Sequence, residues 1–227
     1  MTELVGIFTL LLKTYGKRRW WPARTPFEMM VGAILTQNTA WTNVERAIAA
    51  FGDNLSPAFI LSCDEQTLAD IIRPSGYYNQ KAKRLKTLAG WYMNYGGDIN
   101  RVRACDGDQL RTELLALNGV GHETAYSMLL YAFDKPYFVV DAYTRRLLTR
   151  LGYRLPDAYD DLRVLLEQNL PRDLYVYNEF HALIVEHAKQ HCKAKPLCEG
   201  CVLAPRCKAY EDMHKPALNL QDSAKPE

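Results

Sequence analysis

The chain has 227 residues, of which 48% are hydrophobic and 24% charged, a composition that excludes an intrinsically disordered protein. With 28 basic and 26 acidic side chains, the net charge of +2 is too small to indicate nucleic-acid binding by itself. No apolar run approaches the length of a membrane span, and the N-terminus lacks the pattern of a signal peptide. We expect a cytoplasmic protein, nucleoid-associated if its source is bacterial, with no membrane partner.

Apolar residues recur at helical spacing over residues 3–15, which predicts a first helix. Trp20-Trp21-Pro22 follows, and the proline favours an extended backbone at Trp21. The two indoles have two interpretations: they fill a gap in the core, or they form a stacking wall for a flat ligand. Trp41, farther along the chain, has the same two interpretations.

The segment Thr25-Pro26-Phe27-Glu28 has the form of a capping box with proline at the first helical position, and it opens an apolar helix that runs to Thr36. No alternating strand pattern continues for more than a few residues. The expected fold class is therefore all-α. Further helices are predicted at roughly 42–51, 57–61, 65–72 and 79–95.

Leucines at helical spacing from residue 108 predict a helix that ends at Asn118-Gly119-Val120-Gly121, before a second helix. Gly119 and Gly121 are expected to allow a tight turn that residues with a Cβ would resist. Backbone N–H groups at the start of the second helix have no helical partner and attract phosphate. This segment is therefore predicted to bind an anion.

Asp141 follows an apolar run and precedes an Arg-rich amphipathic helix. On local pattern alone it is an ordinary helix N-cap, with a catalytic carboxylate as the alternative. Helices are also predicted at about 157–168 and 174–191, and the histidines of the second are expected to be packed or solvated rather than metal ligands. The polar tail of residues 211–227 is expected to be disordered.

Four of the six cysteines lie in one stretch, with gaps of five, two and five residues between them. In a reducing cytoplasm this crowding indicates a metal site rather than disulfides. A tetrathiolate zinc and a [4Fe–4S] cluster are both chemically admissible, and spacing alone favours zinc because it is the commoner structural site. The four are Cys192, Cys198, Cys201 and Cys207.

The segment Leu117–Ala125 followed by Val140-Asp141 resembles the helix-hairpin-helix motif and the catalytic aspartate of the endonuclease III-like DNA glycosylases. The resemblance spans about residues 25–207 and implies a two-lobed all-α fold with a DNA cleft between the lobes. The implied division places a helical barrel domain at 25–134, with the helix-hairpin-helix at about 108–133, and a second helical domain at 1–24 plus 135–210.

The resemblance also implies that Asp141 is the catalytic residue and that the loop 192–207 holds a [4Fe–4S] cluster, with zinc as the alternative. The first cysteine gap departs from the family, whose usual gap there is six residues. Bifunctional members carry a lysine nucleophile where this chain has Glu123, and a carboxylate cannot form a Schiff base. The implied reaction is base excision without a lysine-based lyase step, with Glu123 as a second catalytic candidate.

The segment Ile34–Gln37 resembles the one whose glutamine enters the gap left by a flipped nucleotide. The DNA-binding residues that the resemblance implies are Gln37, Asn38, Asn118, Gly119, Val120, Gly121 and Thr124. The base pocket that it implies is made by Trp20, Trp21, Pro22 and Trp41, which together with Glu123 resemble the 3-methyladenine DNA glycosylase branch.

A ring-methylated purine is cationic and a good leaving group, so an electron-rich aromatic pocket could select it. We predict a monofunctional DNA N-glycosylase of base excision repair that acts as a monomer on damaged double-stranded DNA and removes alkylated purines such as 3-methyladenine. One alternative is a glycosylase for oxidised pyrimidines or mismatched bases, whose pocket needs polar partners for the base edge. Another alternative is a non-enzymatic damaged-DNA-binding module.

Overall fold

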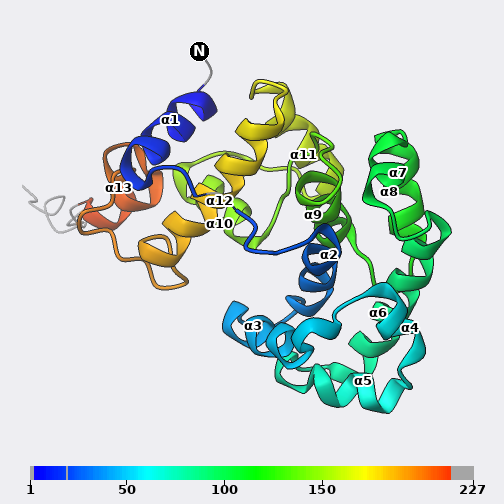
Figure 1. The fold of residues 1–227 in the computed structure, drawn as a ribbon. Helices are drawn as coiled ribbons and strands as arrows, with labels where there is room; N and C mark the ends of the chain where they lie inside the picture. The colour runs from blue at the N-terminus through cyan, green and yellow to red at the C-terminus, as the bar shows by residue number, and fades with distance from the viewer. Residues whose placement is uncertain (1–2, 19, 216–227) are drawn as a thin grey trace, which may run out of the picture.

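The computed structural model describes residues 3–18 and 20–215, and this part of the chain is helical without strands, which confirms the all-α prediction (Figure 1). None of its helices is long and apolar enough to cross a membrane. The helices are α1 (Glu3–Tyr15), α2 (Pro26–Leu35), α3 (Trp41–Ala50), α4 (Pro57–Ser62), α5 (Glu65–Ile71), α6 (Tyr78–Asn94), α7 (Ile99–Ala104), α8 (Gly107–Ala116), α9 (His122–Tyr131), α10 (Ala142–Leu151), α11 (Tyr159–Gln168), α12 (Leu174–Gln190) and α13 (Lys208–His214).

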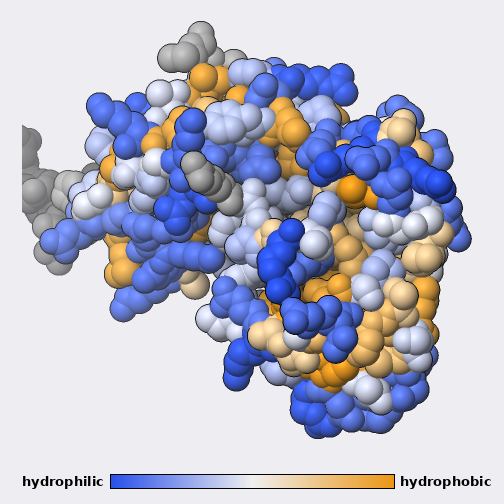
Figure 2. All heavy atoms as spheres, in the orientation of Figure 1, coloured by the Kyte–Doolittle hydropathy of each residue, from blue (hydrophilic) through white to orange (hydrophobic). Residues whose placement is uncertain are grey.

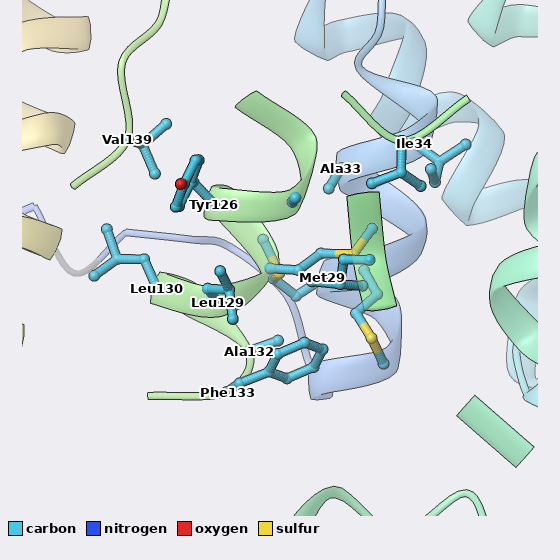
Figure 3. Packing of buried hydrophobic residues seen from close by; sticks show 14 of the residues in the cluster. Met29, Ala33, Ile34, Tyr126, Leu129, Leu130, Ala132, Phe133 and Val139 are labelled. Atoms are coloured by element: carbon cyan, nitrogen blue, oxygen red, sulfur yellow. The ribbon is translucent and has the colours of Figure 1, made fainter. Parts of the chain in front are cut away.

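Helix α2 begins where its capping box predicts, since the Thr25 hydroxyl accepts a hydrogen bond from the Glu28 amide at 3.1 Å. From Phe27 to Leu35 every residue of α2 is buried, so this helix runs through the core. Helix α9 packs against it, and Figure 3 shows Met29 of α2 close to the apolar side chains of α9. Because these two helices pack together, the loop that follows α2 lies near the hairpin that precedes α9.

Helix α6 organises the packing on one side of α2, where it contacts α4, α5 and α2 itself. Its Lys81 is almost completely buried, and the ammonium donates to the carbonyls of Leu35 at 2.8 Å and Ser75 at 2.7 Å. Lys81 therefore ties the end of α2 to the turn that precedes α6. On the face drawn in Figure 2, hydrophobic residues reach the surface in patches among hydrophilic ones.

The N-terminal helix α1 packs against α12, which also contacts α10, and α10 in turn contacts α13 (Figure 1). Helix α12 meets α9, so α9 lies between this group and α2. We propose the division into residues 25–134 and residues 1–24 plus 135–210 for this arrangement. In that description α9 and α12 pack against each other across the two lobes, and Arg111 of α8 also pairs with Asp160 of α11 at 2.6 Å.

The structure departs from the sequence prediction in two elements. Helix α7 was not predicted; it begins at the Asp98 cap, whose side chain accepts from the Asn100 amide at 2.8 Å. The disorder predicted from residue 211 is wrong for residues 211–214, which belong to α13. There Lys208 pairs with Glu211 at 3.2 Å along the helix. Lys215 follows the helix, and residues 216–227 of the predicted tail lie outside the described residues.

Candidate active site

A cavity of about 840 Å³ lies where α2, α9, α10 and α12 approach one another. It brings together residues from both halves of the chain. Of the predicted base pocket, the three tryptophans line this cavity and the proline does not. Its polar and aromatic lining consists of Trp20, Trp21, Thr36, Gln37, Asn38, Thr39, Trp41, Thr42, Glu45, Arg84, Glu123, Thr124, Ser127, Asp141, Tyr143, His181 and Lys189.

Asp141 is the N-cap of α10 and also faces this cavity, so the two interpretations of its sequence pattern are compatible. One carboxylate oxygen, Oδ1, accepts from the Thr144 amide at 2.7 Å. The other, Oδ2, lies 3.4 Å from Nε2 of His181. Desolvation of this carboxyl, which is only 8% exposed, would raise its pKa, but the nearby His181 and the Thr144 amide outweigh that effect and the pKa is lowered.

Glu123 lies in the first turn of α9 and shares the cavity with Asp141. Its residue surface is exposed, yet the surrounding protein is dense enough that desolvation raises its pKa. The negative charge of Asp141 raises that pKa further, and His181 opposes the effect. The site therefore holds two neighbouring carboxyl groups, one favoured as the ionised form and the other shifted toward the protonated form.

The three indoles of the cavity form one continuous aromatic wall. The rings of Trp21 and Trp41 meet edge-to-face, with centroids 5.2 Å apart. The centroids of Trp20 and Trp41 are 6.4 Å apart and their planes are inclined by 41°. Two parallel rings must stand about 7 Å apart to hold a base between them, twice the spacing of stacked base pairs. This wall therefore offers an outer face for stacking rather than a parallel slot.

Trp21 also belongs to the core, since its ring contacts Tyr131 with centroids 5.5 Å apart and its Nε1 atom is buried. Pro22 does not line the cavity and is a correction to the predicted pocket; it is exposed and borders a separate depression beside Trp41. The Trp20 ring is covered by Lys189 of α12, whose ammonium lies 5.1 Å from the centre of that ring.

Gln37 is held by the hairpin rather than projecting freely. Its Nε2 donates to the Gly119 carbonyl and to the Thr124 hydroxyl, each at 3.0 Å, and its Oε1 accepts from Arg84 at 2.5 Å. Asn38 follows with a positive φ of 54° and is exposed. The loop after α2 and the hairpin between α8 and α9 thus form one hydrogen-bonded unit.

Only one of the two hairpin glycines needs the freedom of glycine. Gly119 has φ +83°, and a Cβ there would overlap the Arg84 side chain. Gly121 has φ −89° and open space around it, so the predicted requirement for glycine at this position is wrong. Among the described residues, α9 has no side-chain cap at Gly121, while the Val120 amide is already bonded to the Leu117 carbonyl at 3.1 Å.

The remaining hairpin residues divide by exposure. Asn118 is exposed and available to a ligand, whereas Thr124 is buried beneath Gln37 and Val120 is 6% exposed. Val120 therefore holds the hairpin against the core through its side chain. A phosphate at this hairpin would meet the backbone near Asn118 and Gly121 together with the side chain of Arg84.

The four clustered cysteines surround a small cavity of about 30 Å³ between α10, α12 and the loop that precedes α13. Arg150 donates to Cys192 Sγ at 3.3 Å, and Cys207 Sγ donates to the Arg150 carbonyl at 3.3 Å. Among the described residues, no group of three or more His, Cys, Asp or Glu side chains is arranged to hold a metal ion. The loop brings the thiols to one cavity without forming a closed coordination sphere.

The sequence pattern did not identify several of the residues that line the site. His181, predicted to be merely packed or solvated, is packed and also faces Asp141. Tyr143, Ser127 and Arg84 have no local motif, because their relation to the site depends on how α6, α9 and α10 come together. Of these, Arg84 alone lies in a cluster of basic residues in the sequence, with Lys81, Lys83 and Lys86.

Comparisons with known proteins agree with this geometry. Residues 31–172 match the model of the HhH-GPD superfamily base excision DNA repair proteins. A protein of Methanocaldococcus jannaschii assigned as a DNA repair glycosylase is 50% identical over 206 residues, covering 88% of this chain and 94% of that protein.

Two solved structures extend the comparison. The Helicobacter pylori 3-methyladenine DNA glycosylase bound to 1,N6-ethenoadenine is 30% identical, with a TM-score of 0.69 over 84% of this chain and 98% of that one. A non-covalent endonuclease III–DNA complex is 25% identical, with a TM-score of 0.79 over 95% of this chain and all of that chain (100%). Both similarities extend over most of the helices that build the cavity.

Proposed function

The chain belongs to the HhH-GPD superfamily of base excision DNA repair proteins and is a DNA N-glycosylase, and from this premise we propose that it excises alkylated purines such as 3-methyladenine without cutting the strand. The observation that carries the proposal is the cavity in which the ionised Asp141 faces an aromatic wall and Glu123 replaces a nucleophilic lysine. Its substrate is a damaged base in double-stranded DNA, which the protein binds as a monomer.

The reaction needs the target base outside the helix, because its glycosidic bond is inaccessible in the stack. As the bond between C1′ and the base nitrogen breaks, its electron pair leaves with the base and positive charge develops on the sugar. The Asp141 carboxylate stabilises that charge and accepts the proton of the water that attacks C1′. A 3-methyladenine cation leaves as a neutral base, so the step needs no separate proton donor.

Glu123 supports the absence of a lyase step, since no amine occupies this position to attack C1′. The wall of Trp20, Trp21 and Trp41 supports an extended aromatic substrate. The similarity to the glycosylase that holds 1,N6-ethenoadenine supports a purine-sized base.

Lys189 favours a second candidate substrate class. Its ammonium already lies over Trp20, and a cationic base on that wall would be repelled by it. A neutral lesion, such as an oxidised pyrimidine or a mismatched base, would not be repelled and would find Asn38 and Ser127 as polar partners. Glu45, which accepts from Trp41 Nε1 at 2.9 Å, supplies the negative charge that favours the cationic purine instead.

We propose that Cys192, Cys198, Cys201 and Cys207 hold a [4Fe–4S] cluster, with zinc as the alternative. The donor chemistry fits either group, because all four thiols line one cavity and Arg150 supports a negative charge at Cys192. A bound cluster would fix the loop that precedes α13. The lysines and arginine of that loop would then be presented to DNA phosphates.

The deciding experiment measures base release from dimethyl-sulfate-treated DNA, with the released bases separated and strand nicking scored in parallel. Release of 3-methyladenine without nicking before alkali treatment supports the proposed activity. Duplexes with an oxidised pyrimidine or a mismatched base are assayed beside it, and activity confined to these would replace the substrate with the neutral class. Nicking by the purified protein would remove the monofunctional assignment.

A further inference from the structure

His181 has no assigned role, yet it is the imidazole that faces the Asp141 carboxylate. It lies on α12 and is 5% exposed, and its Nε2 is 3.4 Å from Oδ2 of Asp141. No other partner for this Nε2 atom exists among the described residues. The distance is longer than a well-formed hydrogen bond, so the contact is an electrostatic one that a small movement would shorten.

Tyr131 fixes the orientation of the His181 ring from the opposite side. Its hydroxyl lies 2.6 Å from Nδ1 of His181, and the tyrosine ring contacts Trp21 of the aromatic wall. Burial, followed by the charges of Asp141 and Glu179, raises the pKa of Tyr131 well above its ordinary value. The phenol therefore keeps its proton and can donate a hydrogen bond to Nδ1, an arrangement in which the ring hydrogen lies on Nε2, toward Asp141.

We propose that His181 is a positioning residue for base excision: its Nε2–H holds the free oxygen of Asp141 ionised and directed into the cavity, and Tyr131 selects the tautomer that makes this possible. The inference deepens the proposed function and rests on it, because it assumes that Asp141 acts on the sugar. His181 lines the same cavity as Asp141, and the role inferred for it acts through the Asp141 carboxylate.

The charges around Asp141 explain why such support is needed. Glu123 of α9 is a second carboxyl group in the same cavity and opposes the charge of Asp141. Tyr131 of α9 and Tyr159 of α11 also face these carboxylates, and both phenols remain neutral because their pKa values are raised. The Thr144 amide stabilises Oδ1 only. From α12, Glu179 adds negative charge near Tyr131, and Lys189 lies farther along the cavity wall.

The test compares His181→Leu, His181→Gln and Tyr131→Phe with the wild-type protein. Single-turnover base release from methylated DNA is measured as a function of pH. We expect His181→Leu to lower the rate by about 10- to 100-fold, as for other groups that orient catalytic residues. Its acid limb should move to higher pH, because Asp141 becomes easier to protonate. His181→Gln places an amide N–H near the position of Nε2 and should restore much of the rate, and Tyr131→Phe should fall between the two.

Leu183→Ala is the matched control, since Leu183 is equally buried on α12 but is not part of the cavity wall. It should lower thermal stability without moving the acid limb. A second readout, the carboxyl ¹³C chemical shift of Asp141 followed by pH titration, needs no substrate. An unchanged Asp141 titration in folded His181→Leu overturns the inference, as does a rate profile identical to wild type. A raised Asp141 pKa together with a wild-type protein inactive on every lesion supports the His181–Asp141 coupling and rejects the proposed function.

Discussion

Gln37 and Gly119 are joined by a hydrogen bond of 3.0 Å from the glutamine Nε2 to the glycine carbonyl. This bond connects the loop after α2 to the hairpin before α9, which are far apart in the sequence. The same side chain also bonds to Thr124 and Arg84, so three partners hold it against the protein. Gln37 must therefore leave these partners if it is to fill the gap that a flipped nucleotide leaves in DNA.

The first prediction concerns Gln37→Ala. Base flipping costs a few kcal/mol, and a side chain that fills the vacated space offsets part of that cost. We expect Gln37→Ala to reduce excision from duplex DNA about tenfold, which corresponds to about 1.4 kcal/mol, with a smaller effect on single-stranded substrate. Gln66→Ala, on the exposed face of α5, serves as the control. Equal losses on duplex and single strand would show that Gln37 does not act in the gap.

The second prediction concerns Asp141→Asn. Asparagine caps a helix as well as aspartate does, so the bond to the Thr144 amide and the thermal stability should be largely kept. The negative charge is lost, and we expect excision to fall at least about 10²-fold while affinity for DNA changes little. Rates are measured by single turnover and affinity by a fluorescence binding assay.

Asp64→Asn provides the matched control, because Asp64 is likewise a capping aspartate and accepts from the Thr67 amide at 2.9 Å. Asp64 is the N-cap of α5 and does not line the cavity, so Asp64→Asn should leave excision unchanged. Full activity in Asp141→Asn would remove this residue from its proposed role.

The local patterns of the sequence predicted those features that depend on neighbouring residues. The capping box at Thr25, the helix over residues 3–15 and the turn at Gly119 all appear in the structure. Each is specified within a few residues, where backbone conformation and short-range hydrogen bonds decide the outcome. The spacing of the four clustered cysteines likewise predicts that they lie together, but it does not identify the metal group that they would hold.

Features that depend on distant contacts could not be predicted in the same way. His181 faces Asp141 only because α12 packs against both α9 and α10, and nothing near His181 in the sequence indicates this. The sequence left two interpretations open for the three indoles, core packing or a stacking wall. In the structure they line the cavity, and Trp21 also packs in the core. Such contacts form between residues that are far apart in the sequence, and the local pattern around each residue does not identify its partner.

The third prediction follows from the residue at position 123. Glu123→Lys would place an amine beside Asp141 at the start of α9, where it could attack C1′ and form a Schiff base. Borohydride should then trap a covalent protein–DNA product on an abasic duplex, seen as a shifted band on a denaturing gel. Glu123→Gln has no amine and should give no adduct, and neither should the wild-type protein. A wild-type adduct would indicate another lysine, for which Lys189 is the first residue to replace.

The fourth prediction concerns the cysteine loop. Anaerobically purified protein should be yellow-brown and contain about four iron atoms per chain, as a [4Fe–4S] cluster requires. Cys201→Ser should lose iron, while Cys63→Ser, outside the loop, should retain it. Elemental analysis and visible absorption measure both. Colourless protein with one bound zinc would replace the cluster with a tetrathiolate zinc site.

The fifth prediction is a pH dependence of stability that originates at Lys81. Burial, followed by the charge of Arg84, lowers the pKa of Lys81 to about 8 from the ordinary 10.5. Between these values the folded protein has released the proton and the unfolded chain still holds it. The unfolded state therefore binds more protons, and stability rises with pH across this window.

Lys81→Met isolates this contribution, because the thioether side chain fills a similar volume and does not titrate. Raising the pH from about 8 to about 9.5 should stabilise the wild type by roughly 1.5 kcal/mol relative to the variant. Tyrosines with raised pKa values, such as Tyr15 at about 12, act in the opposite direction at higher pH and are common to both proteins. Urea unfolding at each pH measures the difference, and parallel curves for the two proteins would show that Lys81 keeps an ordinary pKa in the fold.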